Sequence, residues 1–112
     1  MKNKYLEKNI PIVRVKLIED YQIHNKYNKV YGIEEAAPLF YDIIGLSTVE
    51  KLGLICIDKG NNILNASIVN IGTIDNIDIS IGEIFRIALL SNAKYIIIAH
   101  NHPSGNIEPS QC

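Results

Sequence analysis

The chain has 112 residues and a formal net charge of −1, with 11 Lys and Arg against 12 Asp and Glu. This length allows one domain, and a hydrophobic content of 47% is enough for a buried core, which excludes a disordered chain. The balanced charge excludes nucleic-acid binding through overall basicity, though not through a local patch. No apolar run approaches the roughly 18 residues of a membrane span. The first ten residues also lack the apolar core of a signal peptide, so we expect a cytoplasmic protein without a membrane partner.

The N-terminal third is predicted to form a strand and then a helix. Residues 10–18 alternate apolar side chains with Arg14 and Lys16, which predicts a strand with one solvent-facing side. A polar loop or hairpin follows. Residues 33–45 then carry apolar side chains at helical spacing, and Gly45 is placed to end that helix.

A hairpin is predicted in the middle of the chain. Residues 51–58 form a continuous apolar run, which is typical of a buried strand. Cys56 lies inside this run and is expected to be a small buried hydrophobic residue. A turn-forming K-G-N-N and a second apolar segment follow, so residues 51–71 are predicted to be two paired strands.

The last predicted elements are a helix and a short strand. Ser80 and Glu83 have the spacing of a capping box and are expected to open the helix, which Asn92 ends. Residues 95–100 are β-branched and apolar and predict another buried strand, followed by a loop rich in Pro, Gly, Ser and Asn. This order predicts an α+β (or α/β) sandwich, with helices packed against a mixed sheet.

Two histidines stand at the end of this last strand. His100 and His102 are two residues apart, so in extended backbone they point to the same side. Two neighbouring imidazoles supply two of the three protein ligands of a catalytic zinc site. Pro103 and Gly105 turn the chain directly afterwards, which exposes the pair at the sheet edge. An isolated H-x-H also occurs as an ordinary polar loop start.

Two further polar residues are candidates for the same site as the histidines. Ser110 follows His102 by eight residues, and alone it would be a routine helix N-cap. Glu50 directly precedes the apolar strand at 51–58, and alone it would be a solvated carboxylate.

Together these residues resemble the JAB/MPN (JAMM) metalloprotease family, and specifically its RadC-like bacterial branch. The family motif is a Glu, then H-x-H-P, then a Ser eight residues after the second His, and an Asp three residues after that Ser. His100, His102, Pro103 and Ser110 match this spacing, and Glu50 matches by its place before the strand. The block H-N-H-P-S-G followed by P-S is very specific to the RadC-like branch.

The resemblance covers residues 10–112, which we expect to form the RadC-like JAB/MPN domain behind an N-terminal tail of residues 1–9. One position departs from the motif, because the Asp three residues after Ser110 falls one residue beyond Cys112. We therefore expect a domain that is truncated at its C-terminus and lacks its third ligand, with zinc absent, weakly bound or shared. Cys112 is the candidate substitute ligand.

The resemblance implies a zinc-dependent hydrolase that acts on a peptide or isopeptide bond. In that mechanism Glu50 takes a proton from the attacking water and returns it to the leaving amine. The hydroxyl of Ser110 hydrogen-bonds the oxyanion. Asn101 and Ser104 are expected to shape the loop through backbone hydrogen bonds rather than to take part in the chemistry.

Other functions and partners remain open at this point. The branch carries a historical DNA-repair label, and Lys26, Tyr27, Lys29 and Tyr31 form a mild basic and aromatic cluster of a kind that can bind nucleic acid. Without the Asp, the fold could instead serve as a non-catalytic interaction domain. A homo-oligomer is also possible. Ordinary solvated positions are expected for the remaining polar candidates, which are His24, Asp58 and Asp75.

Overall fold

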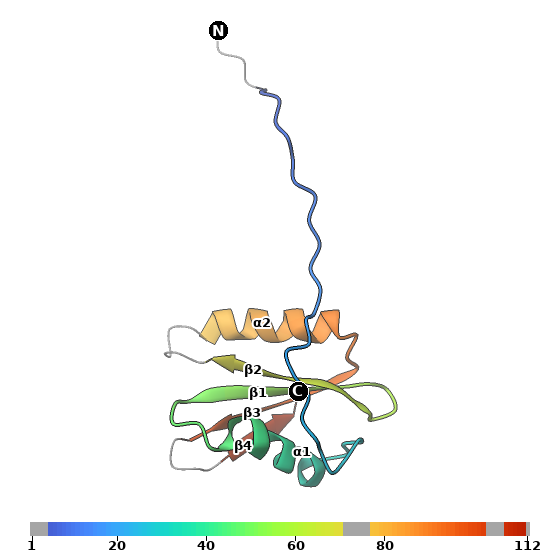
Figure 1. Ribbon diagram of the computed structural model, residues 1–112, viewed down its shortest axis with the longest axis vertical. Helices are drawn as coiled ribbons and strands as arrows, with labels where there is room; N and C mark the ends of the chain where they lie inside the picture. The colour runs from blue at the N-terminus through green and yellow to red at the C-terminus, as the bar shows by residue number, and fades with distance from the viewer. Residues whose placement is uncertain (1–4, 71–76, 103–106, 112) are drawn as a thin grey trace.

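The computed structural model describes residues 5–70, 77–102 and 107–111 (Figure 1). The described strands form one four-stranded sheet in the order β2-β1-β3-β4, and all of its ladders are antiparallel. The prediction of an α+β fold is confirmed, with an antiparallel rather than a mixed sheet. In chain order the elements are α1 (Ile33–Phe40), the π-helical turn η1 (Tyr41–Gly45), β1 (Lys51–Ile57), β2 (Ile63–Asn70), α2 (Ile77–Leu90), β3 (Tyr95–Asn101) and β4 (Ile107–Gln111).

The predicted hairpin is present as β1 and β2, joined by a turn at residues 58–62. The Asp58 carboxylate accepts hydrogen bonds from the backbone N–H groups of Gly60 and Asn62, both at 2.9 Å. The Asn62 backbone bond is the main reason why the pKa of Asp58 lies below its ordinary value. Asn61 has a φ of 65°, a left-handed conformation that Asn tolerates better than most residues.

The two helices cover opposite faces of the sheet (Figure 1). Residues of β1 and β3 alternate between these faces, as the period of a strand requires. On the α1 face, the core consists of Val30, Ala36, Leu39, Phe40, Ile44, Ile55, Ile57, Ile97 and Ala99. On the α2 face, the buried residues are Leu54, Cys56, Val69 and Ile84. The prediction of a buried Cys56 is confirmed.

Helix α2 begins at Ile77, so the prediction that Ser80 opens it is wrong. Ile77, Ile81 and Ile84 extend the helical spacing of apolar residues upstream of Ser80, and this periodicity marks the helix start better than the capping motif does. The prediction for the other end is confirmed: Asn92 has a φ of 56° and donates its N–H to the Leu89 carbonyl, which closes the helix. No helix among the described residues is long and apolar enough to cross a membrane.

The strand predicted at residues 10–18 is absent. Residues 5–28 contain no strand or helix, and the early part of this segment runs away from the domain (Figure 1). A strand requires a neighbouring backbone that takes up its N–H and C=O groups, and no described part of the chain pairs with residues 10–18. The segment joins the fold at Lys29, which forms an isolated β-bridge with Asn62, the residue before β2.

Candidate metal centre

His100 stands near the end of β3, on the face of the sheet that α2 covers. Ile97, Ala99 and Asn101 are buried on the opposite face, whereas His100 keeps a partly exposed side chain. In the β1–β3 ladder His100 pairs with Leu52, which packs against the α2-side core. His100 therefore lies at the rim of that core, open on one side to solvent.

His102 lies beside His100, as the spacing of two residues predicts. The two ring centroids are 4.9 Å apart, and the ring planes meet at 72°. A zinc ion bound at about 2.0–2.1 Å from one nitrogen of each ring, with tetrahedral geometry, would hold the two centroids about 5 Å apart. The separation of the two imidazoles therefore fits a shared metal ion.

Glu50 joins the histidines from another part of the chain. It directly precedes β1, and its Oε1 lies 3.5 Å from Nδ1 of His100. This distance is too long for a strong hydrogen bond but suits an ion pair when the imidazole is protonated. The antiparallel pairing of β1 with β3 brings these residues together across 50 positions of sequence. The Glu50 side chain is 52% exposed, so solvent reaches the carboxylate.

Asn101, between the two histidines, points to the other face and is completely buried. Its Oδ1 accepts the backbone N–H of Lys51 at 2.7 Å. Its Nδ2 donates to the carbonyls of Ser47 at 3.3 Å and Val49 at 3.2 Å. Asn101 forms backbone hydrogen bonds, as predicted, but they reach residues 47–51 rather than the loop that it was expected to shape. Ser104 lies outside the described residues.

Ser110 lies on β4, which was predicted to be loop. Residues 107–111 pair with β3, and Ser110 stands opposite Ile98. The loop prediction is wrong here because the backbone after the turn finds hydrogen-bonding partners along β3. The role of Ser110 as an oxyanion donor stays a prediction. Cys112, the candidate substitute ligand, lies outside the described residues.

The described residues could hold a metal through two imidazoles. No set of three His, Cys, Asp or Glu side chains in the described part of the chain is arranged to bind a metal ion. Catalytic zinc sites use three protein ligands, so His100 and His102 fit two of them.

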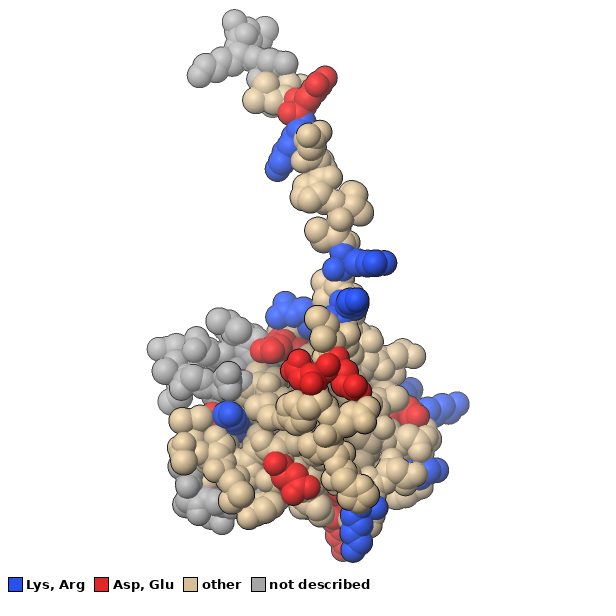
Figure 2. Space-filling view, in the orientation of Figure 1, with Lys and Arg blue, Asp and Glu red and all other residues tan. Residues whose placement is uncertain are grey.

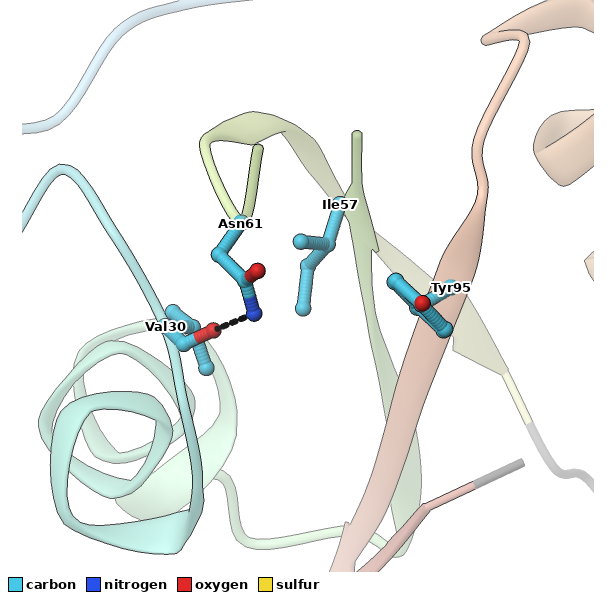
Figure 3. A pocket seen from close by; sticks show the side chains of 4 residues that line it. All are labelled: Val30, Ile57, Asn61 and Tyr95. Carbon is cyan, nitrogen blue, oxygen red and sulfur yellow. Dashed lines mark hydrogen bonds between the residues drawn. The ribbon is translucent and has the colours of Figure 1, made fainter. Parts of the chain in front are cut away.

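A shallow hollow lies at the other end of the same strands (Figure 3). It has a volume of about 110 Å³ and is lined by Val30, Ile57, Asn61 and Tyr95. Asn61 donates a hydrogen bond to the Val30 carbonyl across its rim. Ile57 pairs with Tyr95 at the end of the β1–β3 ladder opposite to Leu52 and His100, so the hollow is separate from the histidines.

The basic and aromatic cluster is spread over exposed chain. Lys26 places its ammonium 5.4 Å from the ring centroid of Tyr27, and Tyr31 is 69% exposed. Figure 2 shows Lys and Arg scattered over the described atoms of the face in view rather than gathered in one patch. His24 is exposed on the same segment, and Asp75 lies outside the described residues.

Comparison with known proteins shows the family to which the chain belongs. The family model described as RadC-like JAB domain matches residues 30–112, and the chain belongs to this family. A UPF0758 protein of Thermosynechococcus vestitus is 40% identical over 76 residues, which are 68% of this chain and 30% of that protein. A UPF0758 protein of Methanosarcina barkeri is 32% identical over 83 residues, or 74% of this chain and 36% of that protein.

A third relative also matches more than half of this chain. A UPF0758 protein of Fusobacterium nucleatum is 38% identical over 68 residues, which cover 61% of this chain and 29% of that protein. The matched part of this chain thus spans about a third of the length of these relatives. The names of these relatives state no activity.

Proposed function

We propose that this domain is a zinc-dependent hydrolase of the metallopeptidase type, acting on a peptide or isopeptide carbonyl. The observation that carries the proposal is the meeting of Glu50, His100 and His102 at one end of the sheet. The two imidazoles lie at a separation that suits one metal ion, and the carboxylate lies next to them and remains open to solvent.

Each residue has a distinct task in this proposal. His100 and His102 would hold the metal, and a bound zinc ion would supply a water of pKa about 7 and polarise a carbonyl. Oε1 of Glu50 lies 3.5 Å from Nδ1 of His100, so the carboxylate stands beside the proposed ligands. Glu50 accepts a proton from the attacking water and passes it to the leaving amine. Ser110 stabilises the oxyanion.

Zinc affinity tests the two ligands, and His24 provides a matched control. We expect His102→Ala to lower the zinc affinity by at least about tenfold, because one imidazole cannot hold the ion that two share. His24→Ala removes an exposed histidine from the N-terminal segment and should leave the affinity unchanged. Competition with a chromophoric chelator measures all three proteins. Equal affinities for the two variants would refute the assignment.

The third ligand can be tested by adding it. The family motif places an Asp three residues after Ser110, so we extend the chain by one Asp after Cys112. The account predicts a gain in zinc affinity of at least about tenfold from this added carboxylate. The same extension with Asn keeps the length and removes the charged donor. If both extended chains bind zinc equally, the proposed ligand set is wrong.

A further inference from the structure

Asn101 is a buried polar residue that the proposed chemistry does not use. It lies between the two histidines in sequence but on the opposite face of β3, and none of its surface is exposed. Its amide makes three hydrogen bonds, two to backbone carbonyls between η1 and β1 and one to the backbone N–H of Lys51, the first residue of β1. A buried amide of this kind is costly unless every bond is made, so its surroundings must be arranged to fit it.

The three bonds enclose Glu50. Asn101 accepts the N–H of Lys51, the residue after Glu50, and donates to the carbonyl of Val49, the residue before it. The third bond goes to Ser47, whose hydroxyl donates to the Val49 carbonyl and accepts the Val49 N–H. The backbone on both sides of Glu50 is thereby attached to the residue between the histidines.

We propose that Asn101 is a positioning residue that fixes Glu50 relative to His100 and His102. This inference rests on the proposed function for its chemical meaning, but the geometry it describes exists without a metal. One planar side chain must supply an acceptor and two donors here. Asn does so, whereas Asp offers no donor and Ser offers one. Because the amide is fully buried, water cannot replace the lost bonds.

The metal-free chain provides the first test, by nuclear magnetic resonance. In the wild-type protein we expect a nuclear Overhauser effect between the Glu50 side chain and the His100 ring. Oε1 of Glu50 and Nδ1 of His100 lie 3.5 Å apart. Asn101→Ala should abolish this effect. It should also raise the hydrogen-exchange rate of the Lys51 amide by about tenfold, because that N–H loses its acceptor.

Asn65→Ala is the matched control. Asn65 also donates a side-chain hydrogen bond, at 2.8 Å to Ser91 Oγ, but it stands on β2 opposite Cys56, away from Glu50. Its loss should lower stability and leave the Glu50–His100 effect intact. If Asn101→Ala also leaves that effect intact, Asn101 has a merely stabilising role and the proposal is overturned.

Asn101→Asp tests the acceptor and the donor roles of the amide separately. It keeps an acceptor for the Lys51 N–H, so that amide should stay protected. It loses both donors, so Ser47 and Val49 are released and the Glu50–His100 effect should weaken. If neither variant folds, hydrogen exchange in the wild-type protein tests the proposal instead. The side-chain amide protons of Asn101 should exchange more slowly than those of exposed Asn92. Equal exchange rates would overturn the proposal.

Zinc affinity then distinguishes this inference from the proposed function. The β1–β3 ladder holds His100, so Asn101→Ala should retain more zinc affinity than His102→Ala does. A loss as large as that of His102→Ala would mean that Asn101 supports the ligands rather than Glu50, which overturns the inference. A wild-type chain that binds no zinc at all would refute the proposed function and leave the resonance test of Asn101 standing.

Discussion

Cys56 shows how one residue is governed by its surroundings. It lies in β1 with no exposed surface, and burial raises the pKa of its thiol, with a hydrogen bond from Ser91 acting in the opposite direction. The thiolate is the reactive form of cysteine, so both the raised pKa and the burial suppress its reactivity. Cys56 is therefore a core residue rather than a nucleophile.

This property can be measured with a thiol reagent. In a Cys112→Ser background, where Cys56 is the single cysteine, we expect no reaction with Ellman's reagent in the native state at neutral pH. Full reaction should follow once guanidinium unfolds the chain. Native-state labelling at the rate of a free thiol would contradict the buried position of Cys56.

Some site residues can be predicted from the sequence much better than others. The i, i+2 spacing places His100 and His102 on one side without any knowledge of the fold. Glu50 could be proposed from the family motif, but its distance from His100 depends on the β1–β3 register. The specific partners of Asn101 could not be predicted, because they lie 50 to 54 positions away and are backbone groups that carry no residue-type signal.

At the scale of elements, the contact between β1 and α1 depends on a glycine. A Cβ built on Gly53 would stand 2.8 Å from Cδ1 of Phe40 and 3.3 Å from Cδ1 of Ile44, so the helix approaches the strand closely only because that atom is missing. Phe40 is fully buried, so its ring is packed on all sides away from solvent.

Two glycine substitutions should therefore have opposite effects on stability. We expect Gly53→Ala to lower the free energy of unfolding by about 1–3 kcal/mol through overpacking. Gly82→Ala in α2 meets no atom within 4 Å, so the helix should gain about 0.5–1 kcal/mol from the better helix former. Urea unfolding measures both. If Gly53→Ala leaves the free energy of unfolding unchanged, α1 does not pack closely against β1 at this position.

The elements that the sequence predicts well are those that local pattern determines. The apolar runs of β1 and β3 and the turn between β1 and β2 are identified by residue type alone. Residues 10–18 have an equally good strand pattern, but a strand forms only beside another backbone. The same dependence on a neighbour explains β4, whose polar, Pro-containing sequence indicates a loop until β3 is seen beside it.

At the scale of the whole molecule, the domain and the N-terminal segment are separate in the structure. Residues 5–20 are exposed throughout and extend away from the sheet (Figure 1). The first buried residue in the described part of the chain is Val30, which is 1% exposed. Val30 donates its N–H to the Asn61 carbonyl at 2.9 Å.

Deletion of residues 1–20 should leave the domain intact. We expect the free energy of unfolding to change by less than about 0.5 kcal/mol, because exposed residues away from packed contacts contribute little. Urea unfolding followed by circular dichroism compares the shortened chain with the full one. A loss of several kcal/mol would show that the apolar residues of this segment pack against the domain in solution.

The central claim is that His100 and His102 bind one zinc ion together, and X-ray absorption at the zinc edge tests it most directly. The fine structure of the zinc-loaded chain should show two imidazole ligands at about 2.0–2.1 Å. His24→Ala should retain both, and His102→Ala should retain one. A wild-type spectrum without imidazole scattering, or one that His102→Ala leaves unchanged, would contradict the account.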